Sequence, residues 1–214
     1  MTEGWTEGWK VGTLERGTVG LLVVLLSNLP PFQPSLAAQD TLPVGLGTLR
    51  RDDITVRFAT GQVEIQVLPL SEEVTRLLAP DTYRSLSGLL KSRRAEIDTA
   101  AARAGLRDPM RVLVTFFGVV PQARFAPEDL EITSRGRLFR PAAIVPLSPA
   151  WSALQLEARQ QAVAIYLFED GISLRETLRV SYQGLANDSW ARSVSALERE
   201  RARVTARARG QRNP

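Results

Sequence analysis

Apolar and polar residues alternate most regularly in the stretch ITVRFATGQVEIQV. Its apolar positions are Ile54, Val56, Phe58, Val63, Ile65 and Val67. A period of two residues is typical of strands with one buried face, so this pattern predicts a β-hairpin. A two-residue turn at positions 60–61 would place Phe58 opposite Val63 and Arg57 opposite Glu64.

From Ser71 onward the apolar spacing lengthens to three or four residues, which is typical of helices. Ser71 precedes two glutamates in SEEVTRLL and is a candidate N-cap. Pro80 interrupts this segment, Asp81 is the expected cap of a longer helix, and Gly105 is its expected end. The apolar residues of the longer helix share one face: Tyr83, Leu86, Leu90, Ile97, Ala101 and Ala104. We therefore predict a helical insertion over residues 71–105 that packs on one side only.

The segments that follow this insertion have the composition of strands. RVLVTFFGVV is almost entirely apolar, which predicts a strand buried on both faces. DLEITSRGRLFRP predicts a second hairpin with its turn at 135–136, which places Ile132 opposite Phe139 and Glu131 opposite Arg140. AAIVPLS, QAVAIYLFED and ETLRVSYQG complete a set of about seven strands. Strands joined by hairpins favour a mainly β fold, an antiparallel sandwich.

The apolar pattern becomes helical a second time from Asn187. Trp190, Val194 and Leu197 fall on one side, and arginine and alanine dominate after Leu197. We predict a C-terminal helix whose apolar face ends at Leu197. It belongs to an arginine-rich region, residues 187–214, whose last ten residues or so are expected to be mobile.

Arginine recurs every fourth residue at Arg199, Arg203 and Arg207, so a helix would carry these three as one basic stripe. The final 23 residues hold seven arginines and two glutamates, a charge of +5. Residues 1–38 hold two positive and three negative charges, so the rest of the chain also carries +5 and its body is close to neutral. This distribution argues against nucleic-acid binding. It leaves two alternatives: weak contact between the stripe and an anionic surface, or a solvated tail.

An uninterrupted run of eight apolar residues lies near the start of the chain, at 19–26. A membrane-spanning helix needs about 20 apolar residues, and prolines follow at positions 30, 31 and 34. Small residues at 35 and 37 have the spacing that a signal peptidase recognises. We predict a secretory signal over residues 1–38 and a mature N-terminus at Ala38 or Gln39. The acidic residues before the run are atypical of a signal, and one explanation is a start codon assigned too early. A retained signal anchor and a buried core element are the alternatives.

Three stretches within residues 110–184, DLEITSRGRLFRP, AIYLFED and LRVSYQG, resemble the immunoglobulin-like sandwich domains of uncharacterised exported bacterial proteins. The resemblance covers about a third of the chain and lacks the Cys…Trp…Cys signature of true immunoglobulin domains. It implies one immunoglobulin-like sandwich domain over residues 39–186. It implies no catalytic residues, and a fold by itself implies no function.

Histidine and cysteine are both absent, which excludes Ser-His-Asp and Cys-His catalysis, His-ligated zinc and iron–sulfur clusters. The absence of cysteine also excludes disulfides and a cysteine-linked lipid, and it suits an exported bacterial protein that relies on its core. Two acidic pairs, Glu128–Asp129 and Glu169–Asp170, fall at predicted loop edges. They are either solvated turn residues or weak candidates for a calcium site built from both pairs. We predict no cofactor and no other metal.

One aromatic residue, Trp151, lies in the predicted loop LSPAWSAL and is either a packing residue or an exposed binding residue. We predict an exported, non-catalytic binding or accessory module of the bacterial cell envelope, periplasmic or secreted, whose partner is an envelope or extracellular protein or polymer. One alternative is a carboxylate-dependent hydrolase, which needs two acids that face each other across a cleft. Another is a protein that binds anionic envelope surfaces through its tail.

Overall fold

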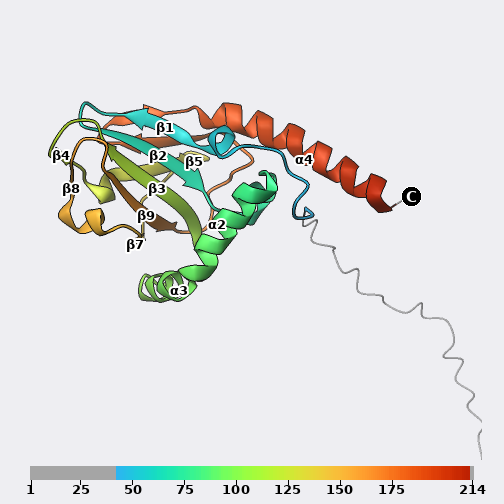
Figure 1. Cartoon of the computed structure of the whole chain (residues 1–214), viewed down its shortest axis with the longest axis horizontal. Helices are drawn as coiled ribbons and strands as arrows, with labels where there is room; N and C mark the ends of the chain where they lie inside the picture. The colour runs from blue at the N-terminus through green and yellow to red at the C-terminus, as the bar shows by residue number, and fades with distance from the viewer. Residues whose placement is uncertain (1–41, 213–214) are drawn as a thin grey trace, which may run out of the picture. The chain divides into compact units, whose positions relative to one another are not determined.

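The computed structural model describes residues 42–212, and the predicted secretory signal over residues 1–38 lies outside this range (Figure 1). Eleven strands are present in these residues: β1 (Val56–Ala59), β2 (Val63–Pro69), β3 (Met110–Gly118), β4 (Ala123–Arg124), β5 (Leu130–Ser134), β6 (Arg137–Phe139), β7 (Ala143–Pro146), β8 (Gln155–Leu156), β9 (Gln161–Phe168), β10 (Leu178–Tyr182) and β11 (Leu185–Asn187). The structure has more strands than the predicted count of about seven, and the short strands β4, β8 and β11 were not predicted.

The helices of the described residues are α1 (Glu72–Thr75), α2 (Pro80–Ser92), α3 (Arg94–Arg103) and α4 (Trp190–Arg212), with short 3-10 helices η1 (Arg51–Ile54), η2 (Pro127–Asp129) and η3 (Pro149–Ala153). None of them is both long and apolar enough to span a membrane.

The strands form two larger sheets in which every pairing is antiparallel. One has the order β1-β2-β3-β9-β7, the other β11-β10-β5-β6, and β4 pairs separately with β8. The two larger sheets meet in the core, where the rings of Phe116 (β3) and Tyr182 (β10) lie 5.6 Å apart. The Tyr166 hydroxyl of β9 donates a hydrogen bond to the Pro127 carbonyl, just before β5 (2.9 Å). The architecture is mainly β and compatible with a β-sandwich.

The first hairpin forms, but the predicted register is wrong by two residues. Phe58 lies opposite Ile65 and Ala59 opposite Glu64. The cause is the turn, in which the Thr60 hydroxyl oxygen accepts hydrogen bonds from the backbone N–H groups of Gln62 (3.1 Å) and Val63 (3.0 Å). This side chain closes a longer loop than the two-residue turn. A shift of two residues keeps every side chain on its predicted face, so the buried set is unchanged.

The second hairpin has the predicted register. Ile132 lies opposite Phe139, and the Nε of Arg140 donates to Oε1 of Glu131 at 2.9 Å. Arg135 and Gly136 both have positive φ, 52° and 75°, as a two-residue type I′ turn requires. Here the glycine turn alone fixes the alignment.

The predicted long helix is in fact two helices, α2 and α3, which are separated at Arg93. Asp81 is not its cap, because Pro80 occupies the first helical position and Ala79 the N-cap position. The predicted end is confirmed, since Gly105 has a φ of +70° directly after the last turn. Of the predicted apolar face, Leu86, Ile97 and Ala101 are buried and the remaining members are partly exposed.

Strand β3 confirms the prediction of burial on both faces, because its five consecutive residues from Val112 to Phe116 are all buried. One face of its sheet meets the four-stranded sheet through Phe116. The edge strand of the same sheet, β7, contacts α3. The helical insertion therefore packs against this sheet with one side, as its apolar face predicts.

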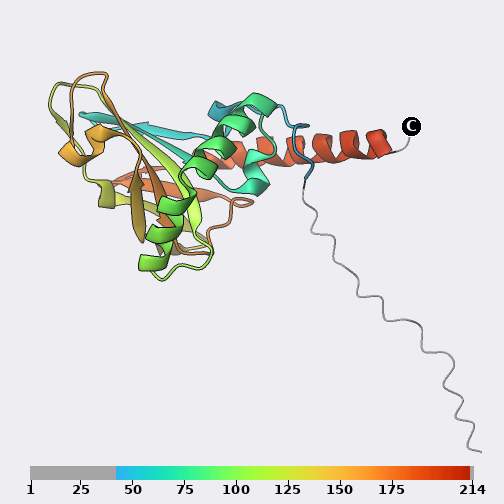
Figure 2. The same cartoon turned by 60° about the horizontal axis from the view of Figure 1, so that its bottom comes forward.

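The C-terminal helix α4 is longer and more firmly packed than predicted. Its buried residues extend past Leu197 to Glu200 and Val204, so the expectation that the apolar face ends at Leu197 is wrong. The expected mobility of the last ten residues or so stays a prediction. Figures 1 and 2 show the second half of α4 running beyond the sheets, beside the segment 42–50. The beginning of the helix packs on the core, where Trp190 is fully buried.

Candidate functional site on the C-terminal helix

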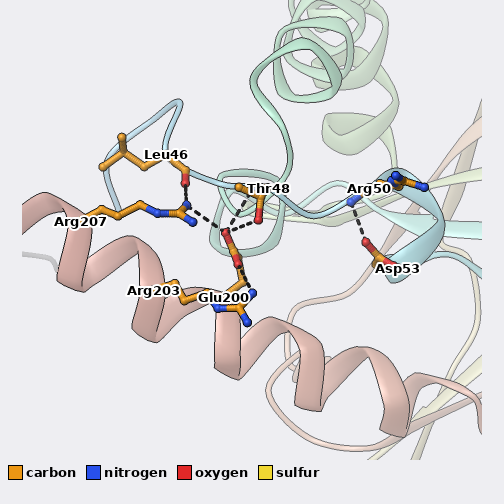
Figure 3. Close-up of polar contacts among 7 residues, drawn as sticks. All are labelled: Leu46, Thr48, Arg50, Asp53, Glu200, Arg203 and Arg207. Carbon is orange, nitrogen blue, oxygen red and sulfur yellow. Dashed lines mark hydrogen bonds and ion pairs between the residues drawn. The ribbon is translucent and has the colours of Figure 1, made fainter.

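Glu200, on the inner side of α4, is a buried acid whose side chain is only 1% exposed (Figure 3). Its Oε1 accepts hydrogen bonds from the backbone N–H and the hydroxyl of Thr48, at 3.0 and 2.9 Å. A buried carboxylate is stable only when it has such partners. Glu200 therefore attaches α4 to the segment 42–50. Its partner Thr48 in that segment lies 152 residues earlier in the chain.

Two arginines of the predicted stripe, Arg203 and Arg207, contribute to the same contact (Figure 3). Arg203 lies 3.4 Å from Oε2 of Glu200, and Arg207 lies 3.5 Å from Oε1. Arg207 also donates to the carbonyl of Leu46 at 2.6 Å. We call Leu46, Thr48, Glu200, Arg203 and Arg207 the Glu200 cluster. Both arginines thus lie beside an internal acid while 64% of the Arg203 side chain and 43% of the Arg207 side chain remain exposed.

A second set of contacts holds the segment 42–50 from the side of α1. The Leu49 N–H donates to Leu77 O (3.1 Å), and the Ala79 N–H donates to Leu49 O (2.8 Å). At Gly47 a Cβ atom would lie 2.2 Å from the Leu77 carbonyl carbon, a distance that only glycine avoids. Beyond the cluster, the Arg50 N–H binds Asp53 at 2.7 Å (Figure 3). The segment is thus held between α4 and the turn that joins α1 to α2.

The outer face of α4 also carries arginines, and these have no acidic partner within the described residues. Arg192, Arg199 and Arg209 are exposed and lie on one face together with Ser195, Ala202 and Ala206. Within residues 42–212 these three arginines form no ion pair, whereas ten arginines located before α4 do. Glu198 is exposed at the margin of this face. Of the predicted stripe, Arg199 therefore forms no ion pair within the described residues, whereas Arg203 and Arg207 are exposed but lie beside Glu200.

Trp151 lies in η3 and belongs to the core, with 7% of its surface exposed. Its ring is 5.9 Å from Phe116, 5.4 Å from Phe125 and 6.0 Å from Tyr166. Burial raises the pKa of the Tyr166 hydroxyl far above its usual range. This environment corresponds to the packing alternative for Trp151, because the side chain offers little surface to a ligand.

The two acidic pairs proposed as calcium candidates do not come together. Glu128 and Asp129 precede β5, whereas Glu169 binds Arg137 (2.5 Å), which lies opposite the last residue of β5. Asp170 accepts a hydrogen bond from the N–H of its neighbour Gly171. Within residues 42–212, no three acidic side chains are arranged so that they could hold a metal ion.

A shallow hollow brings together the acids Glu128, Asp129 and Glu131, with Arg140 and Gln183 beside them. Glu131 is bound by Arg140, and Asp129 accepts a hydrogen bond from Gln183 at 3.0 Å. Carboxylate-pair hydrolysis requires two acids on opposite sides of a cleft. These three lie close in sequence along one strand end, so the hollow gives the hydrolase alternative no specific support.

Glu200 and Thr48 are the site residues that sequence reasoning missed. A signal was present, because Glu200 continues the buried stripe of Trp190, Ser193 and Leu197 toward Val204 at helical spacing. An acid within such a stripe, followed by arginines three and seven residues later, indicates a buried and compensated carboxylate. The partner Thr48 had no comparable signal, since it lies in a segment without periodicity.

Comparisons with protein-family models, with curated protein sequences and with solved structures found no match to this chain. Function is therefore inferred from the arrangement of the side chains described above.

Proposed function

We propose that this protein is an exported, non-catalytic accessory module of the bacterial cell envelope, and that the outer face of α4 binds an anionic surface. In this proposal the body is an immunoglobulin-like sandwich, and residues 1–38 direct the chain to the periplasm or the medium. The partner is an envelope component with exposed negative charge, such as phospholipid headgroups.

The observation that carries the proposal is a set of arginines on the outer face of α4 that form no ion pair within residues 42–212. Arg192, Arg199 and Arg209 lie on an ordered helix, so their charges act together on one side of the molecule. Each basic residue near an anionic membrane contributes about 1 kcal/mol of binding free energy. The contact should weaken with salt, because exposed charges are screened within about 8 Å at physiological ionic strength.

A triple variant, Arg192→Gln/Arg199→Gln/Arg209→Gln, tests this surface by sedimentation with vesicles that contain phosphatidylglycerol. Loss of three arginines should weaken retention about one hundred-fold. The matched control is Arg107→Gln/Arg124→Gln/Arg159→Gln, which removes the same charge from exposed arginines that form no ion pair within residues 42–212. The control should bind like the unaltered protein at low salt. Equal retention of both triple variants would contradict the proposal.

The export part of the proposal has its own measurement. Sequencing the N-terminus of protein recovered from the periplasm or the medium should give Ala38 or Gln39 as the first residue. Recovery of a chain with an intact Met1 in the membrane fraction would instead indicate a retained anchor.

A further inference from the structure

A pocket of about 220 Å³ lies between α1, α4 and the loop before β10. Three arginines and two glutamates from these elements line it: Arg76, Arg175, Arg201, Glu72 and Glu73. Leu42 forms an apolar part of the wall. None of the three outer-face arginines of α4 lines this pocket, so it is a separate feature.

Two of the three arginines are each held by one of the glutamates. Arg76 donates from Nε to Glu72 (2.5 Å) and from Nη1 to the carbonyl of Leu42 (2.8 Å). Arg175 donates from Nε to Glu73 at 3.1 Å. The Tyr83 hydroxyl also donates to Glu72, at 3.4 Å. These contacts fix the glutamates and orient the two guanidinium groups at the rim of the pocket.

Many donors of the pocket remain available. A guanidinium has five N–H donors. Within residues 42–212 the Nη2 of Arg76, both terminal nitrogens of Arg175 and the whole guanidinium of Arg201 have no hydrogen-bond acceptor. Arg201 is only partly exposed, and it forms no ion pair with a described residue. The three arginines and two glutamates leave a charge of +1 in the pocket.

An unpaired and partly desolvated guanidinium favours binding of an anion, because the attraction is stronger where water is partly excluded. Phosphate suits such a site better than a carboxylate does. It offers several oxygens, so it can accept the fork of one arginine and further donors from a second. We propose that this pocket binds a single phosphate group, as a monoester or diester, with Arg201 as its main ligand, Arg175 as the second, and Leu42 against the adjoining carbon chain.

Two sources can present this group: a soluble phosphoester or a phospholipid headgroup. Calorimetric titration of the purified protein with glycerol 3-phosphate probes the first, and titration with a short-chain, monomeric phosphatidylglycerol probes the second. An equal ionic strength of sodium chloride serves as the reference for general screening. Binding of both probes assigns the site to the phosphate group itself, and binding of the lipid alone assigns it to a headgroup with its chain. Binding of neither overturns the proposal.

Arg201→Gln should weaken whichever probe binds by about tenfold or more, because hydrogen bonds from a charged donor are lost. Arg175→Gln should weaken it less. Arg124→Gln, an exposed arginine on β4, is the matched control and should leave binding unchanged. Circular dichroism on each variant checks that it remains folded. Equal weakening by Arg201→Gln and Arg124→Gln would overturn the site. Because these probes are monomeric, the result is independent of whether the outer face of α4 binds vesicles.

Discussion

Arginines occur on α4 in two different environments. Near the inner face, Arg203 and Arg207 lie beside the buried Glu200, and Arg207 also donates to the carbonyl of Leu46. On the outer face, Arg192 and Arg199 form no ion pair within the described residues. A spacing of four residues advances about 40° per step around a helix of 3.6 residues per turn. A row at i, i+4 and i+8 therefore passes from one face to the other, so the charge of a basic tail must be divided by face before it is assigned to a partner.

The largest contrast between the faces should appear at the start of the helix. Trp190→Ala removes a fully buried ring and should lower the free energy of unfolding by about 3–5 kcal/mol. Arg192→Ala, two residues later and exposed, should change it by less than about 0.5 kcal/mol. Urea unfolding followed by fluorescence or circular dichroism measures both.

Trp190→Phe sharpens this test. Within the described residues the indole nitrogen of Trp190 is buried without a hydrogen-bond partner, and phenylalanine removes that donor while it keeps most of the apolar contact. Its loss of stability should be clearly smaller than that of Trp190→Ala. Similar losses for Trp190→Ala and Arg192→Ala would mean that α4 is not packed as described.

A contrast of intermediate size is expected between two glutamates of the same helix. Glu200→Ala leaves the N–H and hydroxyl of Thr48 without their acceptor and should destabilise the protein by about 1–3 kcal/mol. Glu198→Ala removes an exposed acid two residues earlier and should have little effect. Chemical denaturation at neutral pH measures both. If the two variants unfold at the same denaturant concentration, Glu200 does not hold the segment 42–50.

The smallest effect should come from an exposed ion pair just before α4. A hydrogen bond from Arg179 lowers the pKa of Asp188 below its usual range. The folded-state pKa is then below the unfolded-state value, so the stabilisation is fully present above the unfolded pKa, about 4, and is lost as the pH falls through the lowered value. The stability difference between the unaltered protein and Arg179→Gln should therefore shrink from about pH 7 to about pH 3. Urea midpoints that differ equally at both pH values would rule out this linkage.

Local pattern predicted the strands well because alternation and glycine turns are properties of neighbouring residues. The hairpin at 130–139 has the predicted register, since Arg135 and Gly136 adopt a turn with only one geometry. The hairpin at 56–69 has a register shifted by two, because the Thr60 side chain closes a longer loop. Alternation fixes which face is buried but cannot choose between registers that differ by two.

The candidate site was less accessible to prediction because its contacts are made between distant segments. The basic character of α4 was evident, and so was its helical spacing. The pairing of Arg203 and Arg207 with a buried acid depends on Thr48, and the pocket at Arg201 depends on α1 and on the loop that carries Arg175. Neither Thr48 nor Arg175 stands out in its own segment, so only the tertiary structure reveals their roles.

The link between Thr48 and Glu200 also constrains the order of events during folding. The two residues are 152 positions apart, and bringing such distant points together from an open chain costs about 4–5 kcal/mol of loop-closure entropy. The contact therefore forms more readily once the sheets are in place, because they bring the two segments close before it closes. It also cannot form until synthesis has passed Glu200. The connection between α4 and the segment 42–50 thus forms late, after the strands that lie between them in the sequence have been made.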